Sequence, residues 1–261
     1  MTESPISPHT TILEGHISVE AVLTAQSREI FGIFVGERKR DAGVRYLMRL
    51  AKDAGVPVER LPEAEIDQRA QGSTHGGVIA EVGERRFVEM TDLVTGEHPP
   101  FVVMIDGVED PFNFGYAVRT LYASGADGLV VRPRNWMSAA ATVARASAGA
   151  SERIATAVAE TAEDAAAFFR SRGLVIACTG LEDAVPVDEA DLTAPIFLLI
   201  GGEKRGITRS FMDQADVTLQ IPYGRAFRQS LGTAAAAAIL GYEVMRQRRA
   251  KIALSTPGDL S

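Results

Sequence analysis

The apolar run PIFLLIG, at residues 195–201, decides the class of fold. It does not alternate apolar with polar residues, as a strand with one solvated face does, so it predicts a strand buried on both faces of a parallel sheet. Similar runs stand at 101–105 (FVVMI), 128–131 (GLVV) and 174–178 (LVIAC), and VTLQIP at 217–222 supplies a further strand. Helical stretches separate them at 113–124, 138–148 and 163–171, and a helix of about 18 residues follows from Ser230. This half therefore predicts an α/β domain with a parallel sheet.

The first part of the chain has a different pattern. Helical stretches at 18–27 and 43–54 are interleaved with short apolar segments, and HGGVIAEV at 75–82 is a glycine turn leading into an alternating strand. The connector TDLVTGEHPP at 91–100 ends in two prolines, which interrupt regular structure. We expect a small α/β domain before the connector and the larger domain after it. The expected segments are a disordered N-terminus at 1–11, domains at 12–95 and 99–249, and a frayed tail at 250–261.

The composition is that of an ordinary globular protein, with 46% hydrophobic and 23% charged residues in 261, which is enough for two domains. Cys178 is the only cysteine, so no disulfide can form within the chain, and a reducing cytoplasm fits best. The N-terminus lacks a basic segment followed by an apolar one, and no apolar run reaches the roughly 18 residues of a membrane span. We expect a cytoplasmic protein without a membrane segment.

The net charge of −7 argues against indiscriminate binding to nucleic acid, because that affinity grows with the number of phosphates neutralised by lysine and arginine. Any RNA contact must therefore be local. Basic clusters do occur, although each one alone is most simply a solvated surface. They are Arg38, Lys39, Arg40, Arg45 and Arg49 in the first half, then Arg132 with Arg134, and Arg225 with Arg228.

Several common catalytic signatures are missing from the sequence. It contains neither a phosphate-binding G-x-x-x-x-G-K-[ST] loop, nor a strand-linked G-x-G-x-x-G, nor a G-x-S-x-G nucleophile elbow. The four histidines lack metal-ligand spacing and lie outside the parallel-sheet half, so neither histidine catalysis nor a metal site is expected. They are His9, His16, His75 and His98.

Three polar clusters follow predicted strands, at the edge where open α/β sheets bind ligands. The first is IDGVEDPFNFGYAVRT at 105–120, in which Asn113 and Arg119 follow the strand. A helix cap with a surface arginine explains this pair equally well. Whether the cluster is functional therefore depends on the other two.

The second cluster is LLIGGEKRGITRS at 198–210, where a carboxylate, Glu203, stands between glycines that permit close approach of the backbone to a ligand. A strand-end turn explains the glycines but not the carboxylate. The third is LQIPYGRAFRQSLG at 219–232, where Ser230 precedes an alanine-rich helix. A plain N-cap is the simpler interpretation of Ser230.

In this order and spacing, the three clusters resemble the three motifs of the SpoU (TrmH-type) RNA 2′-O-ribose methyltransferases of the SPOUT superfamily. The resemblance covers about residues 101–245 and includes DPFNFG with Arg119, GGEKRGI, and IP followed by SL. ARASAGASE at 144–152 resembles the family's Ser-Ala-Gly-Ala-Glu-like helix end. In the first part, GHISVEAVL, VPVERLPEAEID and HGGVIAEV are similar to the ribosomal-protein-like substrate-binding domain that many members carry. His-Gly-Gly at 75–77 stands where the family usually has His-Gln-Gly.

The resemblance implies methyl transfer from S-adenosyl-L-methionine to a ribose 2′-hydroxyl of a structured RNA, with ribosomal RNA the first candidate and transfer RNA the alternative. It also implies a trefoil knot at the C-terminal end of the sheet and a homodimer. The implied cofactor-binding residues, acting largely through backbone groups, are Gly201, Gly202, Ile221, Leu231 and Thr179. The implied catalytic residues are Asn113, Arg119, Glu203 and Ser230.

Methyl transfer is an in-line displacement that needs an oxygen about 3 Å from the methyl carbon, so positioning supplies much of the catalysis and no metal is expected. Because a guanidinium stays protonated, we expect Arg119 to bind an RNA phosphate and stabilise the developing alkoxide, while the proton passes to phosphate or water. That Asn113 orients Arg119 or the ribose, and that Glu203 fixes its loop and pairs with the dimer partner, are hypotheses.

One position departs from the family. Gly232 stands where the family usually has asparagine after Ser-Leu, and the hydroxyl of Thr233 or a water is expected to occupy the vacated place. Two other interpretations stay open. A catalytically silent RNA-binding relative is compatible with Gly232, and a nucleotide-dependent metabolic enzyme of doubly wound fold would explain the sheet without the motifs.

Overall fold

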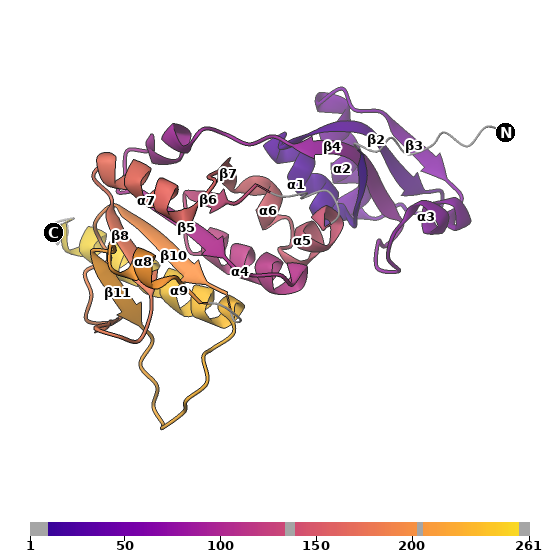
Figure 1. Ribbon diagram of the computed structural model, residues 1–261. Helices are drawn as coiled ribbons and strands as arrows, with labels where there is room; N and C mark the ends of the chain where they lie inside the picture. Colours follow the sequence, from indigo (N-terminus) through magenta and orange to yellow (C-terminus); the bar gives the residue numbers. More distant parts are fainter. Residues whose placement is uncertain (1–9, 134–138, 203–205, 256–261) are drawn as a thin grey trace, which may run out of the picture. The chain divides into compact units, whose positions relative to one another are not determined.

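The computed structural model describes residues 10–133, 139–202 and 206–255, and their contacts form two compact units (Figure 1). Of the described residues, the first unit comprises 10–87 together with 139–153, and the second comprises 88–133, 154–202 and 206–255. None of the helices in the described ranges combines the length and the hydropathy needed to span a bilayer.

The first unit is built on a four-stranded sheet with the order β1-β4-β2-β3. Strand β4 pairs antiparallel with β1 and β2, and β2 pairs parallel with β3. Helix α2 begins where the carboxylate of Asp41 accepts a hydrogen bond from the amide of Val44. The elements are β1 (Thr11–Glu14), α1 (His16–Ala25), β2 (Arg28–Gly36), α2 (Ala42–Asp53), β3 (Val58–Leu61), α3 (Glu63–Arg69), β4 (Val78–Arg85), α5 (Ala140–Ala146) and α6 (Ala150–Arg153).

Two helices from a distant part of the chain complete this unit. In α5, Ala140 and Ala144 belong to the same buried core as Leu13 and Ile33. Beyond it, the carboxylate of Glu152 accepts hydrogen bonds from Ser27, Arg28 and Arg85. The contacts thus place residues 140–153 with the first unit, although they follow the connector in sequence. The linear domains at 12–95 and 99–249 stay a prediction.

The second unit contains a seven-stranded sheet with the order β7-β6-β5-β10-β8-β11-β9, and every pair in it is parallel. The parallel α/β fold expected from the apolar runs is confirmed. The strands are β5 (Phe101–Asp106), β6 (Gly128–Val131), β7 (Ala155–Val158), β8 (Val175–Thr179), β9 (Val185–Pro186), β10 (Ile196–Gly201) and β11 (Val217–Gln220).

Helices cover both faces of this sheet. One face carries η1, α7 and α8, whose buried residues Leu93, Phe169 and Phe211 share a core with the strands. On the other side α4 and α9 pack together, and α9 contacts β10. The helices are η1 (Met90–Val94), α4 (Pro111–Ala123), α7 (Ala162–Ser171), α8 (Arg209–Met212) and α9 (Thr233–Ser255).

Most helix boundaries differ by one or two residues from the sequence-based expectation, and three differences have a clear structural cause or consequence. The connector at 91–100 contains the short 3₁₀ helix η1, because Leu93 packs into the core. Helix α4 begins at Pro111 rather than 113, since Asp110 is its N-cap and accepts hydrogen bonds from the amides of Phe112 and Asn113. Helix α9 begins at Thr233, three residues later than expected, and runs for 23 residues into the segment expected to fray.

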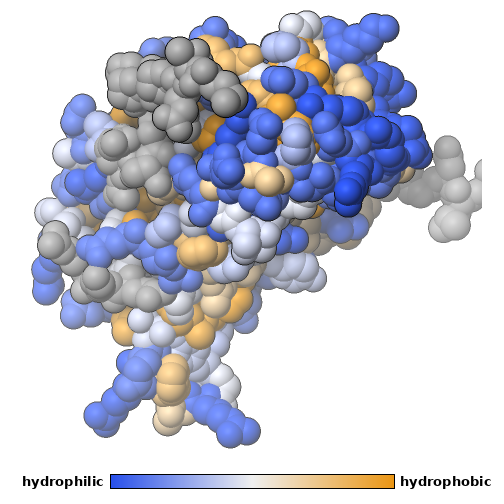
Figure 2. Space-filling model, turned by 90° about the vertical axis from the view of Figure 1, so that its right-hand side faces the viewer, coloured by the Kyte–Doolittle hydropathy of each residue, from blue (hydrophilic) through white to orange (hydrophobic). Residues whose placement is uncertain are grey.

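The strand order places three strand ends side by side. From β5 the chain adds β6 and β7 on one side, then returns to build β8, β10 and β11 on the other. Such a reversal is the point where open α/β sheets form a crevice at their carboxyl ends. Between β11 and α9, residues 222–231 form a loop that projects from the sheet and that we call the arm (Figures 1 and 2).

Candidate cofactor pocket

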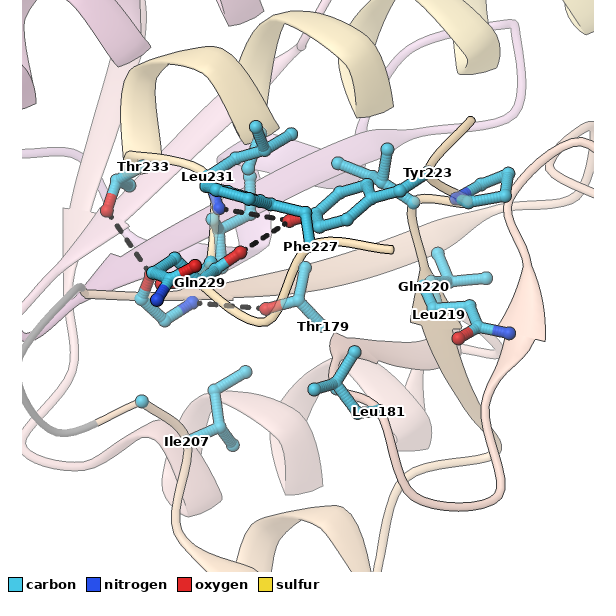
Figure 3. A pocket seen from close by; sticks show the side chains of 18 of the residues that line it. Thr179, Leu181, Ile207, Leu219, Gln220, Tyr223, Phe227, Gln229, Leu231 and Thr233 are labelled. Carbon is cyan, nitrogen blue, oxygen red and sulfur yellow. Dashed lines mark hydrogen bonds between the residues drawn. The ribbon is translucent and has the colours of Figure 1, made fainter. Parts of the chain in front are cut away.

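A cavity of about 690 Å³ lies at the carboxyl ends of β8, β10 and β11 (Figure 3). Much of its lining comes from the last residue of each strand and the residues that follow it: Thr179 to Leu181 at β8, Gly201 and Gly202 at β10, and Gln220 to Tyr223 at β11. The arm closes one side, and the first turn of α9 contributes Thr233 and Ala236. Segments far apart in sequence thus meet around one space.

The walls are largely apolar. In Figure 3, Leu181 and Ile207 lie on one side of the cavity, and Tyr223, Phe227 and Leu231 lie on the opposite side. Polar residues also line the cavity, among them Thr179, Gln220, Gln229 and Thr233. A cavity of this size with apolar walls and a few polar groups is typical of a site for a small organic cofactor.

Two glycines allow close packing around the end of β10, Gly202 against the loop after β5 and Gly201 against the segment that contains Gly206 and Ile207. A Cβ atom added at Gly202 would lie 2.2 Å from the carbonyl oxygen of Gly107, a distance that the backbone cannot tolerate. At Gly201 an added Cβ would lie 3.0 Å from Cγ1 of Ile207. Side chains at these positions would displace a neighbouring loop, which is why this part of the pocket requires glycine.

Hydrogen bonds hold the backbone of Gly201 from two sides. Its N–H donates to Oγ1 of Thr179, and its carbonyl oxygen accepts from Oγ1 of Thr233, both over 3.4 Å. The two threonines belong to β8 and α9. The pocket end of β10 is therefore fixed between its neighbouring strand and the last helix.

Tyr223 connects the two ends of the arm. Its hydroxyl donates to the carbonyl oxygen of Gln229 over 3.3 Å and accepts from the amide of Leu231 over 3.2 Å. These contacts are drawn in Figure 3. A loop without regular secondary structure thereby keeps a defined conformation beside the cavity.

The structure brings together all the residues expected to bind the cofactor: Thr179, Gly201, Gly202, Ile221 and Leu231 line the cavity. Ser230 lines it as well. Because α9 begins at Thr233, Ser230 lies in the arm, and its interpretation as the N-cap of that helix is wrong.

The other expected catalytic residues are not in this cavity. Asn113 is half-buried and Arg119 is exposed, and both belong to α4, which does not contribute to the lining. Among the described residues Arg119 forms no ion pair. Glu203 lies outside the described residues, and so does Arg134 of the second basic cluster.

Sequence reasoning missed several lining residues, above all Ile207, Leu219, Tyr223 and Phe227. The two aliphatic residues carry no distinguishing signal, because they look like any strand or turn residue. The two aromatic residues did carry a signal. Large aromatic side chains are usually buried, so two of them in a polar loop that contains arginines and packs into no core are unusual.

The single thiol is not a candidate nucleophile. Cys178 is buried in β8, and burial raises the pKa of its thiol, which a hydrogen-bonding contact with Thr218 only partly offsets. A thiol, unlike a thiolate, is a poor nucleophile. In the part of the chain that the structure describes, no group of three or more His, Cys, Asp or Glu side chains is arranged to hold a metal ion.

Two family models match this chain. Residues 100–242 match the SpoU rRNA methylase family, and residues 12–88 match the family described as RNA 2′-O ribose methyltransferase substrate binding. The two matches are adjacent and together extend over most of the chain.

Relatives match over nearly their full length. A protein assigned to the TrmH family of tRNA/rRNA methyltransferases, YacO of Bacillus subtilis, is 31% identical over 85% of this chain and 90% of its own. The 23S rRNA (guanosine-2′-O-)-methyltransferase RlmB of Pseudomonas syringae is 30% identical over 90% of this chain and 94% of its own. The fold matches that of the SpoU methyltransferase AviRb from Streptomyces viridochromogenes, crystallised with AdoMet, with a TM-score of 0.75 at 20% identity, covering 93% of this chain and 92% of that one.

Proposed function

The chain belongs to the SpoU rRNA methylase family, and we propose that it methylates a ribose 2′-hydroxyl of ribosomal RNA. The family, the RNA methyltransferase activity and the use of S-adenosylmethionine that the sequence motifs implied are confirmed by these matches. The observation that carries the assignment to this pocket is the convergence of the loops after β8, β10 and β11 on one cavity. A doubly wound metabolic enzyme would not need both matched domains.

The residues around the cavity fit the cofactor. When bound, S-adenosylmethionine supplies a methyl group on a positively charged sulfur. Backbone groups of Gly201, Gly202, Ile221 and Leu231 would hold it by hydrogen bonds, and the apolar walls suit its adenine ring. Thr179 would act indirectly, because its hydroxyl accepts a hydrogen bond from Gly201.

The catalytic roles follow from charge and position. Arg119 keeps its proton, so it would bind an RNA phosphate and stabilise the negative charge that develops on the ribose oxygen. Asn113, six residues earlier on the same helix, would orient the ribose or Arg119. Ser230 would contact the ribose from the arm, and Glu203 would fix the loop after β10.

A homodimer would explain why Asn113 and Arg119 lie away from the cavity of their own chain. Large apolar side chains are exposed on both helices of the α4 and α9 pair: Phe112, Tyr116, Ile239 and Tyr242. Covering these in a second copy would remove them from water and could bring α4 of one subunit to the pocket of the other. Light scattering should give about twice 27.9 kDa at micromolar concentration, and a mass near that of one chain would contradict the dimer.

The trefoil knot and a cytoplasmic location stay predictions of the family resemblance.

The test of the proposed function is transfer of labelled methyl groups to RNA from cells that lack this protein. We expect label in large-subunit ribosomal RNA, at a linkage that resists alkaline hydrolysis, because a 2′-O-methyl group blocks cleavage there. Label in transfer RNA alone would show that transfer RNA is the substrate. If the linkage next to the labelled nucleotide is cleaved by alkali, the methyl group is on a base and not on the ribose. If no RNA is labelled, calorimetry with S-adenosylmethionine distinguishes a silent relative, which binds no cofactor, from an enzyme that lacks its substrate.

A further inference from the structure

The arm, residues 222–231, presents an unusual set of side chains beside the pocket. Phe227 is 56% exposed and Tyr223 is 40% exposed, although large aromatic groups are usually buried. Arg225 and Arg228 flank Phe227 in sequence and are also exposed. At the bottom of Figure 2, at the tip of the loop, hydrophilic side chains lie on both sides of hydrophobic ones.

Hydrogen bonds and a contact between two aromatic rings hold the arm in a defined conformation. The Tyr223 hydroxyl bonds to Gln229 and to Leu231 at the far end. The rings of Tyr223 and Phe227 lie 6.0 Å apart and are tilted by 51°. A pre-formed arm loses less conformational freedom on binding than a flexible one, which favours a binding role.

The charge of the arm is opposite to that of the protein. The chain has a net charge of −7, yet the stretch from Val217 to Tyr242 contains no Asp or Glu, and its only charged side chains are Arg225 and Arg228. Neither arginine forms an ion pair with another described residue. Two uncompensated guanidinium groups beside an exposed ring are suited to a ligand that is both anionic and aromatic.

We propose that the arm binds unpaired nucleotides of the RNA substrate next to the methylated ribose, with Phe227 stacked on a base and Arg225 and Arg228 bound to phosphates. This proposal rests on the proposed function. Exposed aromatic rings stack on bases of single-stranded RNA, and arginine pairs with phosphate through its planar fork. Because the same arm lines the cofactor pocket, a nucleotide held on it lies beside the site of methyl transfer. A second copy of this chain would cover the ring but would leave the positive charge without an acidic partner from this stretch.

The test measures RNA binding without cofactor, so it does not depend on catalysis. The probe is an in vitro transcript of 23S ribosomal RNA, and the variants are Phe227→Ala and the double variant Arg225→Gln with Arg228→Gln. Arg249→Gln, an exposed arginine near the end of α9, is the matched control for loss of charge. We expect about a tenfold or larger rise in Kd for Phe227→Ala, and no change for the control. For the double variant, the slope of log Kd against log salt should fall by about 1.4, or about 0.7 for each phosphate that the variant no longer neutralises.

Each outcome decides the proposal. If both arm variants bind the transcript as the native protein does, the arm does not contact RNA, even if the native protein methylates it. If they bind RNA normally but light scattering shows that their oligomeric state has changed, the arm is an interface between copies and the proposal is wrong. If the native protein binds RNA through the arm but methylates none, the arm is an RNA-binding element, and both the proposed function and the placement of the bound nucleotides beside a methylated ribose fail.

Discussion

The Thr233 hydroxyl donates a hydrogen bond to the carbonyl oxygen of Gly201, with 3.4 Å between Oγ1 and the oxygen. This contact joins the first residue of α9 to the last residue of β10, and both residues line the cavity. Thr233 directly follows Gly232, the position where the family usually has asparagine. The hydroxyl expected from the sequence to replace that asparagine is therefore engaged with the pocket backbone.

Replacing Thr233 by valine keeps the shape of the side chain and removes this hydrogen bond. A hydrogen bond contributes about 0.5–1.5 kcal/mol, so we expect the Kd for S-adenosylmethionine to rise by roughly two- to tenfold. Calorimetry measures the change. Thr233→Ser, which retains the hydroxyl, should bind nearly as the native protein does. Equal affinity in the native protein and the valine variant would remove Thr233 from cofactor binding.

Gly202→Ala should disrupt the pocket. The added Cβ would lie 2.2 Å from the carbonyl oxygen of Gly107, so the loops after β5 and β10 must separate. Overpacking of this kind costs about 1–3 kcal/mol, and we expect a lower free energy of unfolding together with weaker cofactor binding. Gly224→Ala is the matched control, because an added Cβ there meets nothing within 4 Å. Unchanged unfolding and binding in Gly202→Ala would show that the two loops are not in tight contact.

Much of the second unit could be predicted from the sequence because its strands are buried on both faces. The apolar runs ending at Gly201 and Cys178 need no alternation to be recognised. Strands β7 and β9 were not predicted, since β7 has four residues and β9 only two, too few for a pattern. The association of α5 and α6 with the first unit was not predictable either. It depends on long-range contacts such as that of Glu152 with Arg28, which leave no local trace in the sequence.

The part of the site that lies in the three sequence motifs could be predicted. Gly201 ends one recognisable strand and Ile221 directly follows another, so their convergence was expected from the rule that parallel strands end at one edge. Phe227 and Tyr223 lie in a loop whose path is set by the Tyr223 hydroxyl, and no periodicity describes such a path. Propensity rules placed the start of the last helix too early, because Ser230 is a good N-cap by type but belongs to the arm.

Arg119 should be needed for turnover and not for cofactor binding, because α4 does not line the cavity. Lysine retains the positive charge and loses the planar fork that pairs with phosphate, so Arg119→Lys should lower kcat and Arg119→Ala should lower it further. We expect a loss of about 100-fold or more for alanine, typical of removing a group that stabilises developing charge. Single-turnover methyl transfer measures the rate and calorimetry measures the cofactor Kd. Equal rates in the three proteins would exclude Arg119 from the mechanism.

Glu152 should make the first unit sensitive to acid. Burial alone would raise the pKa of this carboxyl, but the attraction of Arg28 and Arg85 and the hydrogen bonds from Arg28 and Ser27 outweigh it and lower the pKa. A lowered pKa means that the stabilisation is complete above the ordinary value of about 4.3 and is lost as the pH falls through the native value. Glu152→Gln leaves two arginines buried without a counter-charge, at a cost of about 3–5 kcal/mol at pH 7.

Denaturant titrations of the native protein and Glu152→Gln should therefore differ most at neutral pH. The difference between the two proteins should narrow as the pH falls below about 4.3, where the carboxyl of the unfolded protein takes up a proton, and should be lost below the lowered pKa of the folded protein. Glu29→Gln, which changes an exposed carboxylate next to Arg28 in β2, is a control for the loss of one charge. A difference that stays constant from pH 7 into the acid range would show that the charge of Glu152 does not stabilise the unit.

Gly232→Asn restores the residue that the family usually has and separates a working enzyme from a silent relative. Glycine offers only its backbone at this position, and the carbonyl oxygen of Gly232 already accepts a hydrogen bond from the amide of Ala236 in the first turn of α9. An asparagine side chain would add one hydrogen bond, worth about 0.5–1.5 kcal/mol, or up to roughly tenfold in rate if it forms only in the transition state. Because Thr233 already engages Gly201, we expect a working native enzyme and a change of no more than about tenfold in Gly232→Asn. Labelled methyl transfer to RNA from cells lacking the protein measures both rates. If Gly232→Asn transfers methyl groups and the native protein transfers none to any cellular RNA, the native chain is a silent relative and its proposed function is wrong.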